Sequence, residues 1–514
     1  MRVETSGMNN TIRIVCGVGL SLFGGACATV DPKPDYLRTG GHIRAATGVA
    51  QPYDPQREDI RERVDDLLEN GISAQEAVQI CLLNNPGLQS AFLDVGIARA
   101  DLVQAGLFSN PFLGIATRFP DGGGLANLEA GIAQNLAELW QIPIRKKAAK
   151  RELDRAVLRI AREAALLATE CKAAYYDAVG ADARLEIAEE NFSIAKNLLD
   201  MALARKQAGT ATELDVNLSR SLAIQAELNA AAARLDASDA RRRLATLLGL
   251  ESDAQQWQLI DELPDPPPET LEPERLIAAA KGWRLDLRSA RQAVEAAAWR
   301  VKEQYRLIFP TVEVGIELER EERRPRSGRN LLADTARSSL ASGALTAPEI
   351  EPRSARRAEK GQDIIVGPSL GIELPLFDQN QAQIARARYA YEQAIKNLDA
   401  LERVVTQEVR SAVDRAVTAW RMAQMYRDRS VPLAKRNLAL SREAFEAGQA
   451  SFLTVLEAQR FYLESRRGYI DAARAAAVAI PELERVIGLP FERLGGDIPP
   501  PPDAEDDEIT EVNP

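Results

Sequence analysis

Three segments of the chain alternate apolar and polar residues, which is the pattern of β-strands. Residues 311–319 read Thr-Val-Glu-Val-Gly-Ile-Glu-Leu-Glu, so every second side chain is apolar and the residues between are mostly glutamate. Residues 127–132 and 369–374 repeat this alternation. The pattern predicts one strand pair within about residues 110–136 and a second pair at about 309–320 and 363–376.

Most of the remaining chain has helical periodicity. From about residue 144 to 206, alanine, leucine and isoleucine are interleaved with charged residues on every turn. Roughly 60 residues of helix would be about 90 Å long at 1.5 Å per residue, which exceeds a domain core or a membrane. Such a helix must pack along partner helices as a coiled coil, and its many alanines allow a close approach.

The chain contains an internal duplication. The interval from Gly209 to Gly448 is 239 residues, and the same interval separates the Leu-Gly-Leu at 248–250 from the Ile-Gly-Leu at 487–489. This predicts two repeats at 72–250 and 273–489, joined by a Pro-rich linker at 251–272. The Pro-rich, acidic segment 490–514 is predicted to be a disordered tail.

The alternating strands leave two interpretations open. Strands of about ten residues with one apolar side suit a transmembrane β-barrel. An antiparallel sheet that covers a soluble core would show the same alternation. Four strands cannot close a barrel, because known single-chain barrels start at eight, so a barrel would need several copies in closed cyclic symmetry.

The N-terminus has the order of a bacterial secretory signal. Two arginines precede an apolar run at residues 14–25 that ends in small residues, which predicts a signal peptide over 1–26. Residues 24–27 resemble a lipobox, in which Cys27 becomes a lipidated first residue, followed by an extension over 27–71. Cleavage after Ala28 without lipidation and a translation start at Met8 are the alternatives.

Composition narrows the chemistry. The chain has 64 basic and 75 acidic residues, and the resulting net charge of −11 argues against a nucleic-acid partner. His42 is the single histidine, which excludes a two-histidine zinc motif, and no phosphate-binding glycine loop is present. We therefore expect neither an enzyme nor a metal site nor a cofactor. Cys81 and Cys171 are predicted to be buried thiols, since two cysteines do not make a disulfide framework.

Over about residues 72–489 the chain resembles the TolC-like outer-membrane efflux channel family. The resemblance depends on the signal, the duplicated strand pair and helix hairpin, the glycine-containing hairpin tips and the linker, in that order. The segments Ala-Gly-Leu at 105–107 with Asn-Pro at 110–111, and Pro-Leu-Phe-Asp-Gln-Asn-Gln at 375–381, look most like the heavy-metal cation efflux branch.

The resemblance implies a mainly α fold with a small β part. Three chains with four strands each would form a 12-stranded β-barrel in the outer membrane of a Gram-negative bacterium, continued by a coiled-coil α-barrel in the periplasm. The partners implied for this homotrimer are a periplasmic adaptor (membrane fusion) protein, an inner-membrane transporter of the proton-driven type and outer-membrane lipid. The trimer would passively export small solutes, such as heavy-metal cations or drugs.

The resemblance also implies functional residues. The alternative for each is a purely structural role, as a helix cap or as part of a solvated helix or strand face. The tips expected to dock the adaptor comprise Gly209, Thr210, Ala211, Thr212, Leu214, Gly448, Gln449, Ala450, Ser451 and Leu453. The expected pore constriction comprises Glu457, Thr454 and Asp215, although Thr454 departs from the acidic pattern of the family. The residues expected in the barrel lumen are Glu129, Glu313, Glu317, Glu319 and Glu373.

Two other functions remain open at this stage. The same architecture could form a duct for type I protein or polysaccharide secretion. A lipid-anchored periplasmic coiled-coil scaffold would explain the helices but not the strands. The Arg-rich insertion at 321–361 is expected to be an external loop, either solvated or in contact with acidic surface sugars and lipids.

Overall fold

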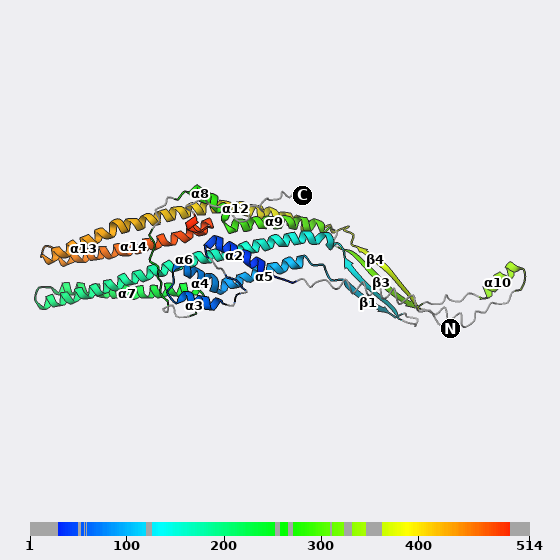
Figure 1. Cartoon of the computed structure of the whole chain (residues 1–514), viewed down its shortest axis with the longest axis horizontal. Coiled ribbons are helices and arrows are strands. Elements are labelled where there is room, and N and C mark those ends of the chain that lie inside the picture. The colour runs from blue at the N-terminus through cyan, green and yellow to red at the C-terminus, as the bar shows by residue number, and fades with distance from the viewer. Residues whose placement is uncertain are drawn as a thin grey trace. The chain divides into compact units, whose positions relative to one another are not determined.

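The computed structural model describes residues 29–49, 53–55, 57, 59–119, 126–251, 257–265, 271–308, 311–322, 331–345 and 362–493. The signal peptide with Cys27, the acidic tail from residue 494 and much of the linker and of the insertion lie outside these residues. The chain divides into two compact units (Figure 1). The helical unit comprises residues 1–103, 149–296 and 392–514, and the sheet unit comprises residues 104–148 and 297–391.

The sheet unit contains a four-stranded antiparallel sheet in the order β1-β2-β3-β4. The strands are β1 (Phe112–Arg118), β2 (Asn127–Asn135), β3 (Val312–Glu322) and β4 (Gln362–Ile372). Consecutive strands of the chain are therefore neighbours in the sheet, and β1 and β4 form its two edges. The predicted fold class is confirmed: the described chain is mainly helical with a small antiparallel sheet.

The register places most of the large apolar residues of the four strands on one face, because directly opposed residues of an antiparallel pair point the same way; Phe112 and Ile365 lie on the other face. We call the first face the apolar face; it comprises Leu113, Ile115, Leu128, Ala130, Ile132, Val312, Val314, Ile316, Leu318, Ile364, Val366, Pro368, Leu370 and Ile372. Its large side chains are open to the surroundings of the single chain, with Ile115 at 68% and Leu370 at 67% exposed. The sheet therefore does not cover a core of its own.

The helical unit is built from two similar sets of helices. The first set is α4 (Ala74–Asn84), α5 (Pro86–Ala105), α6 (Glu138–Gln207) and α7 (Glu213–Leu247). The second set is α8 (Pro273–Trp283), α9 (Leu285–Arg306), α12 (Gln381–Met425), α13 (Val431–Glu446) and α14 (Phe452–Ile487). In Figure 1 the hairpin of α6 and α7 is cyan to green, and that of α13 and α14 is orange to red. Among the described residues, no helix combines the length and the apolar composition that crossing a membrane requires.

The two sets form the same junction near their ends. The side-chain amide of Asn84 donates hydrogen bonds of 2.9 Å to the carbonyls of Leu248 and Gly249. In the second set, the guanidinium of Arg284 donates to the carbonyl of Val486, two residues before Gly488. Both glycines have positive φ, 68° and 85°. A conformation that favours glycine thus recurs at the 239-residue interval.

The long helix of the second set is interrupted where that of the first set is continuous. Helix α6 runs for 70 residues, whereas a π-helical turn at Tyr426–Ser430 separates α12 from α13. Pro432 explains the interruption, because it has no backbone N–H to donate and its ring crowds the preceding turn. The backbone N–H of Val431 instead bonds to the carbonyl of Tyr426.

Alanine forms the buried seam of α7. The buried positions up to residue 237 are Val216, Ser219, Ala223, Ala226, Ala230, Ala233 and Ala237. Their spacing alternates between three and four residues, which is the heptad spacing of a coiled coil. Small side chains at these positions let the partner helix approach closely, as expected from the sequence.

Three helices lie in segments for which the sequence indicated none. Helices α2 (Lys33–Thr47) and α3 (Ile60–Leu68) lie in the N-terminal extension, and α10 (Leu331–Ser342) lies in the insertion that we expected to be a loop. Helix α2 contributes Tyr36, Ile43 and Ala46 to the same hydrophobic core as α4, α6 and α7. The extension is therefore part of the folded unit.

Candidate functional site

The two hairpin tips have the same backbone geometry. After α6, the N–H of Gly209 donates to the carbonyl of Lys206, and that of Thr210 donates to Arg205. After α13, Gly448 and Gln449 make the corresponding bonds to Phe445 and Ala444. Gly209 and Gly448 have φ of 77° and 72°, so both helices end in the left-handed turn for which glycine is suited.

The returning helices begin with matched caps that differ in one residue. The Thr212 hydroxyl accepts from the backbone of Asp215, whose carboxylate accepts from the backbone N–H of Thr212, which completes a capping box. The hydrogen bond that the Asp215 carboxylate accepts from the backbone N–H of Thr212 has the largest effect and lowers the pKa of Asp215. The hydrogen bond with the Thr212 side chain lowers this pKa further. At the second tip, Ser451 caps the backbone of Thr454, but the Thr454 hydroxyl pairs only with that of Ser451, at 3.1 Å.

An exposed leucine lies at each tip. Leu214 and Leu453 are 66% and 58% exposed, and they occupy equivalent positions of the two repeats. The bases of the two tips touch, because the guanidinium of Arg205 lies 5.1 Å from the ring centre of Phe445. A cavity of about 250 Å³ lies between them, lined by residues that include Thr210, Ala211, Asp215, Arg205 and Phe445.

A ladder of ion pairs connects α6 of the first repeat with α14 of the second. Its four pairs are Lys172–Glu484, Asp177–Arg474, Arg184–Asp471 and Glu190–Arg466. The numbers rise along α6 as they fall along α14, so the two helices are antiparallel. The ladder fixes the two hairpins to each other over this length.

Beyond the ladder, toward the tips, a groove of about 520 Å³ lies between α6, α7 and α14. Its lining is mainly leucine, isoleucine and alanine, with five charged residues: Arg184, Glu457, Arg460, Glu464 and Arg467. The predicted constriction residue Glu457 is exposed and borders this groove. Asp215 and Thr454 instead lie in the caps of different tips, so a single chain does not gather the three residues into one cluster.

The predicted lumen residues share the face of the sheet opposite to the apolar face, which we call the acidic face. It contains Glu129, Glu313, Glu317, Glu319, Glu321 and Asp363. Glu129 is directly opposite Glu319, and Glu321 is opposite Asp363. Like charges at such positions destabilise a sheet unless water surrounds them. Arg118 relieves part of this repulsion through a 2.8 Å ion pair with Glu129.

Glu373 lies one residue beyond the end of β4. Its backbone N–H donates to the carbonyl of Thr311 at 3.3 Å, so the pairing with β3 extends to this position. Among the residues that the structure describes, no three metal-ligating side chains come together as they would in a metal site.

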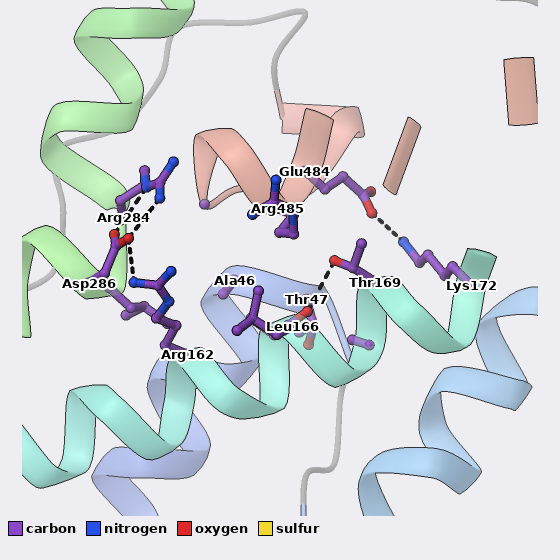
Figure 2. A pocket seen from close by; sticks show the side chains of 14 residues that line it. Ala46, Thr47, Arg162, Leu166, Thr169, Lys172, Arg284, Asp286, Glu484 and Arg485 are labelled. Carbon is purple, nitrogen blue, oxygen red and sulfur yellow. Dashed lines mark hydrogen bonds and ion pairs between the residues drawn. The ribbon is translucent and has the colours of Figure 1, made fainter. Parts of the chain in front are cut away.

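A buried charge cluster escaped the sequence analysis (Figure 2). The Arg284 guanidinium is 4% exposed and contacts the carboxylates of Asp286, at 2.7 Å, and Glu408, at 2.5 Å. Arg162 of α6 also pairs with Asp286. Burial alone would raise the pKa of Asp286, but its hydrogen bonds and ion pair with Arg284, helped by Arg162, lower it overall. The cluster joins the two repeats beside a small cavity of about 40 Å³.

The sequence contained one signal of this cluster. Arg284 forms the break between α8 and α9, and Asp286 is the second residue of α9; the neighbouring residues Trp283, Leu285 and Leu287 are apolar and buried. Charged residues in an apolar context indicate buried partners.

Similarity to known proteins agrees with this architecture. Residues 276–489 match the family described as outer membrane efflux protein. The chain is 24% identical over 321 residues to the cobalt-zinc-cadmium resistance protein CzcC of Cupriavidus metallidurans, covering 61% of this chain and 66% of that protein. It is 27% identical over 315 residues to the pyoverdine export outer membrane protein OpmQ of Pseudomonas aeruginosa, covering 60% and 57%.

The chain thus spans 57–66% of the length of these curated relatives. Its fold is similar to that of the CmeC outer membrane channel of Campylobacter jejuni, with a TM-score of 0.62, 14% identity and coverage of 90% of this chain and 92% of that one. The family match over residues 276–489, the two relatives and the shared fold agree with one another: the chain is similar to outer membrane efflux proteins.

Proposed function

We propose that the chain is the outer-membrane channel of a tripartite efflux system and that it works as a homotrimer. Three copies close a 12-stranded barrel from their four-stranded sheets, and their helical hairpins surround a tunnel. Solutes pass through it passively, and the channel itself catalyses no reaction. Lipidation at Cys27 would add an anchor in the outer membrane.

The observation that carries the proposal is the two-sided sheet. Its apolar face is continuous across four strands and largely exposed in one chain. Exposure of so much apolar surface is unfavourable in water but suits contact with lipid. The edges β1 and β4 still carry unpaired backbone groups, which pairing with neighbouring copies would satisfy.

The hairpin tips are the proposed docking site for a periplasmic adaptor protein. Gly209 and Gly448 keep the tips narrow, and Leu214 and Leu453 offer exposed apolar contacts at equivalent positions. Thr210, Ala211, Thr212, Gln449, Ala450 and Ser451 complete this surface. The adaptor would connect the channel to an inner-membrane transporter of the proton-driven type, which supplies the energy.

We propose that the exported solutes are small and that cations pass readily. The acidic face would line the barrel, and a lumen lined by carboxylates favours cations. Glu457 of the three copies would form the constriction of the trimer, to which Thr454 and Asp215 would contribute from the caps of the two tips. The relative named for cobalt, zinc and cadmium resistance supports metal cations as cargo. With one histidine and five methionines, the chain is poor in soft ligands, so metal selection would lie in the transporter.

Conductance in planar bilayers tests the proposal. The detergent-extracted trimer should form ion channels, and Glu457→Gln should reduce cation preference because it removes three charges from the constriction. Glu464→Gln is the matched control, since Glu464 lies one heptad further along α14, borders the same groove and pairs with Arg460. A protein that stays monomeric and soluble without detergent would refute the channel, and unchanged selectivity in Glu457→Gln would refute the constriction.

A further inference from the structure

Three helices of the sheet unit bring cations onto two aromatic rings of α9. The Lys147 ammonium, on α6, lies 4.5 Å from the ring centre of Trp299, and the Lys302 ammonium lies 4.4 Å from the same centre. Further along α9, the ring centre of Tyr305 lies 5.5 Å from the Arg388 guanidinium of α12, which also donates a hydrogen bond to the Tyr305 hydroxyl. Residues 299, 302 and 305 are spaced by three, so they lie on one side of α9.

The positive charge at these rings has no carboxylate to balance it. Six cations lie on the same helix segments: Lys146, Lys147, Lys302, Arg306, Arg386 and Arg388. We call them, together with Trp299 and Tyr305, the basic–aromatic cluster. Within the described part of the chain, none of the six cations forms an ion pair with a carboxylate. Glu138 of α6 instead accepts a hydrogen bond from the backbone N–H of Ser109 at 2.7 Å, and Glu303 of α9 is only partly exposed.

The two lysines make an anion the fitting partner. Both ammoniums contact one ring, so they lie closer to each other than the sum of their distances to its centre. Two like charges at such a distance repel each other unless water or an anion screens them. The apolar stems and rings of the cluster indicate that this anion belongs to an amphipathic molecule.

The cluster lies beside the end of the sheet where the strands meet the helices. Strand β2 leads into α6, α9 leads into β3, and β4 leads into α12. Every member of the cluster is within about three helical turns of these junctions. Helical side chains incline toward the N-terminus, so Lys147 and Arg388 incline toward the sheet. Large apolar residues are also exposed at this end, with Leu376 at 73% and Phe377 at 94%.

We propose that the basic–aromatic cluster binds the phosphate groups of anionic phospholipids in the periplasmic leaflet of the outer membrane. This inference rests on the proposed function, in which lipid covers the apolar face of the sheet and the helices extend into the periplasm. Headgroups of that leaflet would then lie at the strand ends that adjoin the cluster. The rings and the apolar stems contact the boundary of the acyl region, while the charges reach the phosphates.

The charge of the cluster also predicts which headgroups it prefers. Phosphatidylglycerol has a net negative charge, whereas phosphatidylethanolamine has an ammonium that the six cations repel. We therefore expect the cluster to bind phosphatidylglycerol more tightly than phosphatidylethanolamine.

Native mass spectrometry of the full-length protein in a non-ionic detergent tests the proposal. Each of the two lipids is added at increasing concentration, and its apparent dissociation constant is measured. A basic residue beside anionic lipid strengthens binding roughly fivefold, so Lys147→Gln/Lys302→Gln should weaken the binding of phosphatidylglycerol about 25-fold. The binding of phosphatidylethanolamine should stay nearly unchanged in this variant.

Two further variants separate the cluster from total charge. Lys435→Gln/Arg436→Gln is the matched control, because it removes two exposed cations from α13 of the helical unit and should bind phosphatidylglycerol as the wild type does. Trp299→Leu keeps the charge and an apolar side chain but removes the ring that holds both lysines, so it should weaken the binding of phosphatidylglycerol.

Equal affinity of the wild-type protein for the two lipids would overturn the proposal, and this measurement does not depend on the folding of any variant. Unchanged affinity of Lys147→Gln/Lys302→Gln for phosphatidylglycerol would overturn it too. Inorganic phosphate should not displace the lipid; displacement that depends on the two lysines would assign the site to soluble phosphate instead. Conductance of the same preparation tests the channel separately, since a conducting protein without lipid preference contradicts only this inference.

Discussion

The guanidinium of Arg284 lies in the interior of the helical unit and balances two carboxylates, Asp286 and Glu408. Removing one member of a buried ion pair leaves an uncompensated charge and costs about 3–5 kcal/mol. We expect Arg284→Ala to lower the free energy of unfolding by this amount, measured by urea denaturation in detergent. Arg403→Ala is the control, because Arg403 is 79% exposed in its pair with Asp399 and should cost below about 1 kcal/mol. Equal losses in the two variants would contradict the role of the cluster.

The same cluster gives a pH dependence with a defined sign. Although burial alone would raise the pKa of Asp286, its bonds and ion pair with Arg284 lower it below the unfolded value. A depressed carboxyl pKa contributes stability above the unfolded value of about 3.9, and this contribution is lost as the pH falls through the folded value. We expect Asp286→Asn to flatten the acid side of the stability profile. If the stability of Asp286→Asn fell as steeply as that of the wild type below about pH 4, Asp286 would not be the source of this pH dependence.

Residue-scale chemistry was predictable where partners are near in sequence. The capping box of Ser73 with Glu76 joins residues three positions apart, as the Ser-x-x-Glu pattern indicates. The positive φ of Gly209 and Gly448 is likewise a local property for which glycine is suited. The partners of Arg284 were not predictable, because Glu408 is 124 residues away in sequence and only the tertiary fold brings the two together.

At the scale of the helix, the start of α7 depends on its cap. Thr212→Ala removes the hydroxyl that accepts from Asp215, and the loss of an N-cap costs about 1 kcal/mol. We expect faster amide hydrogen exchange in the first turn of α7, with the rest of the helix unchanged. Ser451→Ala is the matched change at the second tip, where exchange should quicken in α14 instead. Unchanged amide hydrogen exchange in the first turns of both α7 and α14 would show that the caps do not stabilise these turns.

The alanine seam of α7 makes a second prediction at this scale. Ala226 is 2% exposed and belongs to a cluster with Ala195 and Ala223. Ala226→Leu would overpack this contact and should cost about 1–3 kcal/mol, measured as a lower unfolding temperature of the helical signal. Ala231→Leu adds the same volume at an exposed position of the same helix and should leave the temperature nearly unchanged. If Ala231→Leu lowered the unfolding temperature more than Ala226→Leu does, the packed face of α7 would be the side that contains Ala231, and the prediction would be wrong.

Periodicity predicted the long helices but not their irregularities. Helix α6 was expected from about residue 144 and begins at Glu138, so that Pro143 lies inside the helix in its second turn. The π-helical turn at Tyr426–Ser430 was not expected, because its cause, Pro432, lies inside a helix that continues on either side. Helices α2 and α10 were missed because their segments contain several polar residues and no long apolar stripe.

At the scale of the whole molecule, alternation predicted the strand pairs, and their register explains why one chain is incomplete. The strands expected at 309–320 and 363–376 lie at Val312–Glu322 and Gln362–Ile372. Periodicity alone could not separate a barrel from a sheet on a soluble core, because both alternate. The exposure of the apolar face in the structure distinguishes them, because a sheet on a core would bury that face.

The apolar face can be tested at two adjacent residues. Ile316 lies between Ile132 and Pro368 on the apolar face and is 54% exposed, whereas Glu317 points to the acidic face. If lipid covers the apolar face, Ile316→Arg places a charge in the bilayer at about 2–4 kcal/mol per copy and should prevent assembly in the outer membrane. Glu317→Arg should assemble normally, measured as heat-resistant trimer in the membrane fraction, and should shift conductance toward anions because it reverses a lumen charge. Normal assembly of Ile316→Arg together with failure of Glu317→Arg would mean that the sheet has the opposite orientation, with its acidic face outward.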